Sequence, residues 1–306
     1  MFKNILMATD MLKTCYPAML TAIEIVKKSN GNLTILHVRE SRPNAHANIQ
    51  NRFGTDKGSI FSDGHEKKFK QKIFKAISGA LEPRVNYEIK VASGIPWNEI
   101  IKRARAQKVD LIILGPHAER LEEKETAAHS GPIGSTIEGV VMHERCPVMI
   151  VNRIVAKESM KFKKVMVSID FSKSCTSALR FAIEFSRKHT SKLFLFHMLP
   201  VPPFPEYSQA NYEAELLAAD KKLQALCKEI PAGIEYEHKS WGGALPYLEI
   251  GKYADRKDID LIVMGSHTKE KQGKWYVGSA VERVSIRSAC PVIVVTDHAA
   301  PLSTDG

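Results

Sequence analysis

The sequence predicts an α/β fold of two tandem doubly wound domains, each a five-stranded parallel sheet with helices on both faces. Three observations predict it. The chain has 306 residues, about twice the length of an average domain. The two halves repeat each other. Each half alternates short apolar runs with helical patterns, which is typical of a parallel sheet covered on both faces.

The repeat is visible along most of the chain. Residues 3–37 align without gaps with residues 163–197, and eleven of these positions are identical. Further on, Val109–His117 aligns with Ile259–His267, and Cys146–Val151 aligns with Cys290–Val295. The matches stay in order, so a duplication explains them. We expect domains at residues 1–153 and 161–298, with the boundary in the polar stretch at residues 152–161.

The second half shows the order of elements best. Apolar runs predict strands at Val165–Ile169, Leu193–Met198, Ile234–Lys239, Leu261–Met264 and Val292–Val295. Apolar residues at helical spacing predict helices at Ser174–Lys188, Leu216–Ile230, Pro246–Lys257 and Ser279–Arg287. The first half follows the same order. The last strand of each half would lie at a sheet edge that needs covering.

Composition excludes several classes of protein. A hydrophobic share of 44% and a charged share of 25% do not fit a disordered or collagen-like chain. No stretch approaches the roughly 20 apolar residues of a membrane span. Asp10 stands where a signal peptide would still be apolar. We therefore expect a cytoplasmic protein with no membrane partner.

Cysteines recur at matching places in the two halves. Cys15 matches Cys175 and Cys146 matches Cys290, and neither a C-x-x-C motif nor a zinc-type spacing is present. We interpret them as small buried hydrophobes rather than redox groups, and we expect no metal site.

The net charge of +10 would suit an anionic partner, but it is spread evenly, with +6 in residues 1–152 and +4 in residues 153–306. The basic run Lys67–Lys75 is crossed by an apolar stripe of Phe69, Ile73, Phe74 and Ile77. Its lysines therefore form the solvated face of a helix, and no nucleic-acid partner is expected.

Polar residues and glycines follow the strands at the end where such sheets bind ligands. They are Asp10 and Asp170, His37-Val38 and His197-Met198, and Gly115-Pro116-His117 and Gly265-Ser266-His267. The aspartates could bind a ligand or cap a turn, and we favour the ligand. For His37 and His197 we favour a local bond to the backbone; for His117 and His267 the alternatives are balanced. No nucleophile–base–acid set can be assembled, so no catalytic residue is assigned.

Together these features resemble the universal stress protein family, twice over. The resemblance depends on the Asp after the opening strand, LHV and FHM, the GPH and GSH turns, the Gly-Ser pair that opens the last helix, and the closing CPV. It implies an adenine-nucleotide alpha-hydrolase-like fold, a stress-response function and slow ATP hydrolysis at most. The implied cofactor is ATP or a related adenine nucleotide, which Mg²⁺ can accompany.

In the family's ATP-binding branch the motif reads G-x-x-G-x(9)-G-[ST]. The second half matches its ends, but Thr268 replaces the middle glycine. The resemblance assigns adenine and ribose contacts to Ile169, Asp170 and Met198, and phosphate contacts to the loop. The expected nucleotide site comprises Ile169, Asp170, Met198, Met264, Gly265, His267, Thr268, Gly278, Ser279 and Ala280, with Asp10, Val38, Gly115, Gly134 and Ser135 as the first-half counterpart.

The two loops differ in charge. In the first half Ala118 replaces the middle glycine, and the loop is longer and carries Glu119, Glu122, Glu123 and Glu125. The second loop carries Lys269, Lys271 and Lys274, which suit a polyphosphate. We therefore expect the second half to be the main nucleotide site. A scaffold or adaptor with vestigial clefts, and a small-ligand carrier, remain alternatives.

The resemblance also bears on assembly. In the family the last strands pair across a dimer interface. In a tandem chain the two halves can pair with each other through these strands, and a homodimer of two chains stays open.

Overall fold

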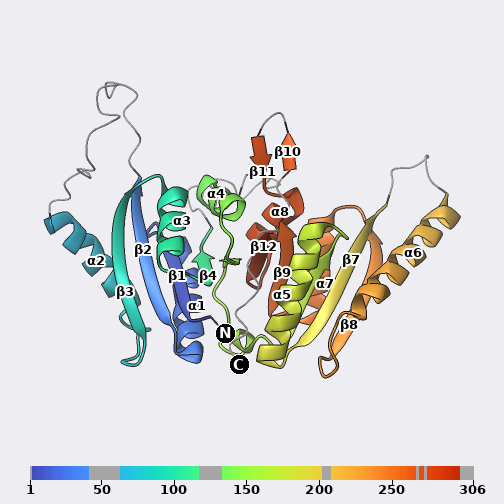
Figure 1. Cartoon of the computed structure of the whole chain (residues 1–306), viewed down its shortest axis with the longest axis horizontal. Helices are drawn as coiled ribbons and strands as arrows, with labels where there is room; N and C mark the ends of the chain where they lie inside the picture. The colour runs from blue at the N-terminus through green and yellow to red at the C-terminus, as the bar shows by residue number, and fades with distance from the viewer. Residues whose placement is uncertain are drawn as a thin grey trace.

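A computed structural model describes residues 2–40, 63–116, 133–201, 208–266, 269–271 and 274–296. Ten strands form one sheet in the order β3-β2-β1-β4-β5-β12-β9-β6-β7-β8 (Figure 1). They are β1 (Asn4–Thr9), β2 (Asn32–Glu40), β3 (Asn86–Gly94), β4 (Leu111–Leu114), β5 (Val148–Ile150), β6 (Lys164–Ile169), β7 (Lys192–Pro200), β8 (Tyr236–Gly243), β9 (Leu261–Ser266) and β12 (Val292–Thr296). A separate hairpin pairs β10 (Lys269–Lys271) with β11 (Lys274–Tyr276).

Each half contributes five parallel strands, which confirms the predicted fold class. In the first half β1 pairs with β2 and β4, β2 with β3, and β4 with β5, always in parallel. The second half repeats this order with β6, β7, β8, β9 and β12. The chain therefore changes direction across the sheet beside β1 and again beside β6, and ligands of such sheets bind at these switch points.

The halves meet at their last strands. β5 and β12 pair antiparallel, with Met149 opposite Ile293, and both side chains are fully buried. Each strand thereby covers the edge that the other half would expose. Figure 1 shows the two halves side by side, with the carboxyl ends of β2 and β7 on the upper side of the view.

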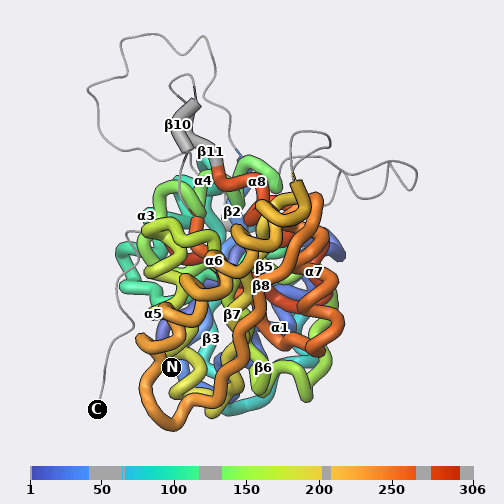
Figure 2. Tube along the Cα trace, turned by 90° about the vertical axis from the view of Figure 1, so that its right-hand side faces the viewer, coloured from blue at the N-terminus to red at the C-terminus, as the bar shows by residue number. Residues whose placement is uncertain are grey.

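Helices cover both faces of this sheet. They are α1 (Tyr16–Ser29), α2 (Asp63–Ile77), α3 (Pro96–Ala106), α4 (Ser135–His143), α5 (Lys173–His189), α6 (Gln209–Cys227), α7 (Pro246–Lys257) and α8 (Ser279–Arg287). One core contains residues of α1, α2, α5 and α6, and the other contains residues of α3, α4, α7 and α8. Both cores continue through β5 and β12. Figures 1 and 2 show α6 with β8 at the outer edge of the second half.

The elements differ from their prediction in a few places. α7 and α8 have the predicted bounds, whereas α6 begins at Gln209 rather than at Leu216. Its start is set by Ser208, whose hydroxyl oxygen accepts a hydrogen bond from the Asn211 N–H (3.3 Å). In α2 the predicted apolar stripe is wrong at Phe74, whose side chain is exposed. No described helix has the length and apolar content needed to span a membrane.

Candidate functional site

A cleft of about 410 Å³ lies at the carboxyl ends of β1, β2 and β4, at the switch point of the first half. Its lining includes the five residues that sequence analysis placed at the first-half site: Asp10, Val38, Gly115, Gly134 and Ser135. Thr9, His37, Glu40, Ile95, Trp97 and Thr136 are among the other lining residues. Residues from distant parts of the chain thus share one concave surface, because the parallel strands end together.

The turn after β1 is held by Asp10. Its Oδ1 accepts hydrogen bonds from the Leu12 N–H (2.8 Å) and the Cys15 thiol (3.0 Å). Met11, between Asp10 and Leu12, has a φ of 65°. A bulky residue is rare in this left-handed region, where it stores of order 1–3 kcal/mol of strain.

The second half repeats the turn. Asp170 Oδ1 accepts hydrogen bonds from the backbone N–H (3.0 Å) and the hydroxyl (2.6 Å) of Ser172, and Phe171 has a φ of 62°. Both aspartates therefore cap their turns, and Asp10 also lines the cleft. The same strained turn stands at both switch points.

The strand-end histidines bond to the adjacent strand. His37 Nδ1 lies 2.9 Å from the Thr9 carbonyl oxygen, and His197 Nδ1 lies 2.8 Å from that of Ile169. A ring nitrogen beside a carbonyl must carry the proton, so Nδ1–H is the donor in both halves. This confirms the predicted local role for both residues. His117 and His267 lie outside the described residues.

The four cysteines that recur between the halves are buried or partly buried, and they are poor nucleophiles. Burial, with the nearby Asp10 carboxylate, raises the pKa of Cys15 to about 12, and burial raises the pKa of Cys175 to about 11. Burial also raises the pKa of Cys146 and Cys290. All are free thiols, and the high pKa values disfavour the reactive thiolate. These facts support the packing role expected from the sequence.

The glycines of the motif are needed for different physical reasons at different positions. A Cβ on Gly265 would lie 2.4 Å from the Ser174 carbonyl carbon, and one on Gly115 would lie 2.9 Å from Cys15 Cα. Both glycines therefore let a helix start pack against a strand end. The expected nucleotide site includes Gly265, and this packing is a second reason for a glycine at that position.

The glycines that precede α4 and α8 behave differently from that pair. Gly278 has a φ of −57°, and no described atom lies within 4 Å of an added Cβ. The backbone at Gly278 would therefore accept a residue with a side chain. Gly134 has a φ of 100°, a conformation that L side chains rarely adopt. Neither glycine can cap the first-turn N–H groups with a side chain, which leaves these donors to other partners.

The second-half counterparts sit at equivalent places. Ile169, Asp170, Met198, Met264 and Gly265 lie at or directly beyond the carboxyl ends of β6, β7 and β9, while Gly278, Ser279 and Ala280 form the start of α8. His267 and Thr268 lie outside the described residues, as do the side chains of Lys269, Lys271 and Lys274.

One carboxylate joins the two site regions. Glu282 Oε1, in the first turn of α8, accepts a hydrogen bond from the Ile133 N–H (3.0 Å), directly before Gly134. Burial, with the nearby Glu138, raises the pKa of Glu282. The starts of α4 and α8 are thus in contact across the junction of the halves.

Sequence reasoning missed three polar residues of the first-half cleft, Thr9, Glu40 and Thr136, and Thr136 aligns with Ala280, which the resemblance assigned to the site. Thr9 aligns with Ile169, which the resemblance assigned to the site, so the repeat contained the signal for it. Glu40 aligns with Pro200, and only its place at a strand end pointed to it. Trp97 also lines the cleft, and its ring stacks on that of His143 with ring centroids 4.9 Å apart.

Comparison with known families agrees with this architecture. The model of the universal stress protein family matches residues 1–152 and again residues 161–296. The chain belongs to the universal stress protein family. It is a tandem member, since the family model matches each half separately.

Two curated relatives each align with about half of this chain and with most of their own length. "Universal stress protein MJ0531" of Methanocaldococcus jannaschii is 29% identical over 154 residues, which cover 48% of this chain and 89% of the relative. "Universal stress protein YxiE" of Bacillus subtilis is 26% identical over 147 residues, or 44% of this chain and 99% of the relative.

A solved universal stress protein from Archaeoglobus fulgidus covers 96% of both chains with a TM-score of 0.59 and 21% identity. At that identity it supports the fold of the whole tandem chain.

Proposed function

We propose that this universal stress protein binds ATP or a related adenine nucleotide in the cytosol, mainly in its second half, and serves the stress response through that binding. The observation that carries the proposal is the first-half cleft, where five residues of the family pattern share one concave surface. The second half is a duplicate of the first. Its residues at the ends of β6, β7 and β9 therefore suggest an equivalent binding place.

Charge favours the second half for the triphosphate. Among the described residues that line the first-half cleft, Asp10 and Glu40 are the charged ones, and neither lysine nor arginine is present. Each close carboxylate–phosphate contact costs on the order of a few kcal/mol at an effective dielectric near 20. The loop before α8 contains Lys269, Lys271 and Lys274 in its sequence, which would attract the phosphates instead.

The chain's own groups suit a bound nucleotide. Met198 on β7 and Met264 on β9, the two strands that flank β6, are buried near their carboxyl ends and would pack against the base. Asp170 would accept a hydrogen bond from a ribose hydroxyl. The first-turn N–H groups of α8 and the Ser279 hydroxyl would donate to phosphate oxygens.

Mg²⁺ would neutralise part of the phosphate charge. No cluster of three or more His, Cys, Asp or Glu residues that could hold a metal occurs in the described part of the chain. Mg²⁺ would therefore enter as a companion of the nucleotide, held largely by its phosphates.

A titration separates nucleotide binding from a purely structural role. The purified protein is denatured and released nucleotide is identified by mass spectrometry; the native protein is then titrated with ATP by calorimetry. Gly278→Val should abolish the binding heat while leaving the fold intact, because the Cβ position is open and the φ is ordinary. Gly79→Val is the matched control, since its Cβ position is also open and lies far from the site.

The outcomes are distinct. Loss of heat in Gly278→Val alone supports the assignment of the phosphate site. Equal ATP affinity in Gly278→Val and Gly79→Val would show that the assignment of the phosphate site is wrong. No released nucleotide and no heat at millimolar ATP would overturn the proposal and favour a scaffold or adaptor.

A further inference from the structure

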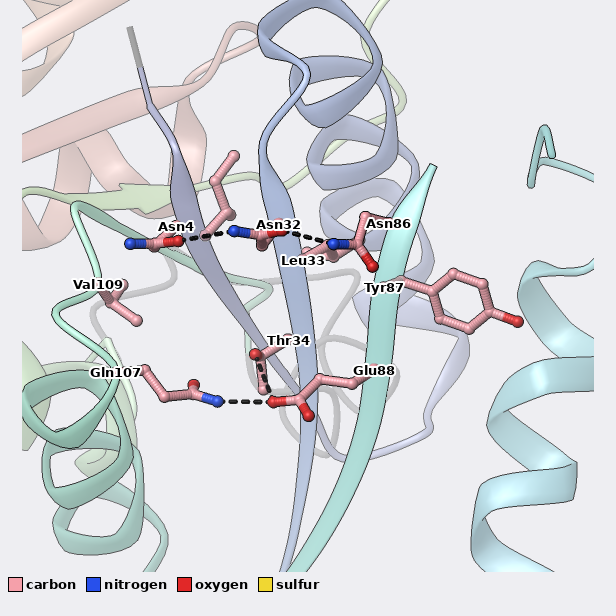
Figure 3. A pocket seen from close by; sticks show the side chains of 10 residues that line it. Asn4, Asn32, Leu33, Thr34, Asn86, Tyr87, Glu88, Gln107 and Val109 are labelled. Atoms are coloured by element: carbon pink, nitrogen blue, oxygen red, sulfur yellow. Dashed lines mark hydrogen bonds between the residues drawn. The ribbon is translucent and has the colours of Figure 1, made fainter. Parts of the chain in front are cut away.

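A second cleft, of about 360 Å³, lies at the amino ends of β1, β2 and β3, at the opposite end of these strands from the candidate nucleotide site. Figure 3 shows three asparagines in register across it. Asn32 Nδ2 donates to Asn4 Oδ1 (3.0 Å), and Asn86 Nδ2 donates to Asn32 Oδ1 (2.6 Å). A row of neutral amides therefore forms one rim.

Further along the same strands, a hydrogen-bonded group centres on Glu88 (Figure 3). Its Oε1 accepts the Thr34 hydroxyl (3.0 Å) and the Gln107 amide (2.6 Å), and its Oε2 pairs with Lys90 Nζ (3.0 Å). Partial burial raises the pKa of Glu88, but the bonds from Lys90, Gln107 and Thr34 outweigh it and hold that pKa below its usual value. The carboxylate charge is thus matched within the protein.

One acceptor in this cleft has no partner among the described residues. Gln107 Oε1 is buried and makes no hydrogen bond. Its orientation is fixed, because the Nε2 of the same amide donates to Glu88. A buried polar atom without a partner costs about 1–3 kcal/mol, so this amide is an incompletely satisfied part of the cleft wall.

The second half fills the equivalent space. Thr34 aligns with Phe194, which is buried, and the Lys192 and Lys257 ammonium groups lie over its ring at 5.6 and 6.0 Å. Lys192 takes the place of Asn32 and pairs with Glu235 (2.6 Å), and Lys257 takes the place of Gln107. The cleft is therefore a property of the first half's own side chains and is not imposed by the fold.

We propose that this amino-end cleft binds a small uncharged polyhydroxy molecule, a sugar or polyol. Amides and hydroxyls both donate and accept hydrogen bonds, as the hydroxyls of such a ligand do. The Glu88 charge is already paired, so a charged ligand has no opposite charge to meet. Val109 adds an apolar contact for the C–H groups of the ligand. The volume is in the range of small-molecule sites.

The test uses the full-length protein with D-glucose, D-ribose, myo-inositol and glycerol as separate probes. Binding is followed by saturation-transfer NMR, and affinities by titration; an open polar cleft predicts dissociation constants in the millimolar range. Thr34→Phe copies the second half and should weaken binding at least about tenfold. Gln107→Lys should do the same, because it replaces a neutral amide of the cleft wall with the charged side chain of the second half. Thr34→Ser keeps the hydroxyl and should retain binding.

Circular dichroism and the melting temperature verify the fold of each variant. If Thr34→Phe misfolds, Gln107→Lys still tests the proposal, because Gln107 lies at a helix end. Saturable binding of at least one probe, lost in the first two variants and kept in Thr34→Ser, supports the proposal. The absence of saturable binding for every probe overturns it. Binding that Thr34→Phe and Gln107→Lys leave unchanged also overturns it, because the ligand would then sit elsewhere.

Discussion

At the scale of single residues, Gly265 shows how one motif position can serve packing. Its missing Cβ lets the backbone of Ser174 and Cys175 approach closely. We predict that Gly265→Ala lowers the free energy of unfolding by about 1–3 kcal/mol through overpacking. Gly251→Ala, inside α7 with no described atom near the new Cβ, should raise it by up to about 1 kcal/mol. Urea denaturation of both variants measures this, and equal effects would contradict the packing argument.

A second residue-scale prediction concerns Trp97 and its neighbour in α4. A Cβ on Gly139 would lie 2.5 Å from Trp97 Cγ. In the second half Tyr247 replaces the tryptophan, and the guanidinium groups of Arg283 and Arg287 lie 4.9 and 4.8 Å from the centre of its ring. Arg283 aligns with Gly139. The second half therefore combines the smaller tyrosine ring with a large helix residue, and the first half combines the larger tryptophan ring with glycine.

Gly139→Ala should therefore destabilise the protein by about 1–3 kcal/mol, although alanine ordinarily favours a helix. Combining it with Trp97→Tyr should recover part of the loss, because the smaller ring leaves room for the methyl group. A double-mutant cycle by chemical denaturation measures this coupling. Additive losses would show that the two side chains do not compete for the same space.

Residues that repeat between the halves could be placed from the sequence, and those that diverge could not. Asp10, His37 and Gly115 recur in the second half, and the repeat brought them to the strand ends. Thr34 and Gln107 do not recur. Thr34 matters because it lacks the ring that Phe194 has at the equivalent position, and Gln107 because its Oε1 has no partner within the described part of the chain. Neither feature is a pattern along the sequence.

At the scale of elements, predicted bounds hold where burial is strongly periodic. α8 buries Val281, Val284 and Ser285 on one side, and its predicted start and end agree with the structure. α6 buries only Ala219, Leu223 and Cys227 along its length. Its sequence pattern therefore indicated the central turns but not the first two turns, which a polar cap at Ser208 determines.

The end of α5 predicts a pH dependence. His189 stacks on Phe185 at 4.2 Å and meets the edge of Phe162 at 5.8 Å, beside the segment that joins the halves. Burial, with nearby cations that include Lys28 and Lys163, lowers the pKa of His189 to about 4. The unfolded state, with an ordinary pKa, binds the proton more tightly. Stability should therefore fall as pH drops from about 6.5 towards 4.

His189→Phe keeps an aromatic ring and removes the titration. Its unfolding free energy should change less between pH 7 and pH 4.5 than that of the parent, by roughly 1–3 kcal/mol after allowance for partial exposure. Urea unfolding at several pH values measures the slope. His238→Phe is a suitable control, because His238, on β8, is partly exposed and lies 4.0 Å from Asp220 of α6, away from the end of α5. Parallel pH profiles for the parent and His189→Phe would contradict the assignment.

At the scale of the whole molecule, duplication has produced one sheet from two halves that differ in chemistry. The candidate nucleotide sites share a turn, a histidine bond and a glycine before a helix. The amino ends of the strands differ, with amides in one half and lysines around a phenylalanine in the other. Such a chain can keep one joint framework while each half acquires its own ligand.

That framework predicts cooperative unfolding of both halves. The two cores run across the β5–β12 junction, where the Asn152 side chain donates to the Ser285 carbonyl and the Thr296 hydroxyl donates to that of Glu144 (3.3 Å). We expect Asn152→Ala to lower the global stability by about 1–3 kcal/mol, because the Ser285 carbonyl loses its partner. Hydrogen exchange should then speed up alike in β1 and β6, the central strands of the two halves.

Asn211→Ala, on the exposed first turn of α6, should leave exchange in both strands unchanged within about 0.5 kcal/mol. If Asn152→Ala accelerates exchange in β1 but not in β6, the halves unfold independently and β5–β12 pairing is only a contact between them. Equal acceleration means that the junction carries the stability of both halves. A ligand bound in one half would then stabilise the other against unfolding, by mass action on a single folded state.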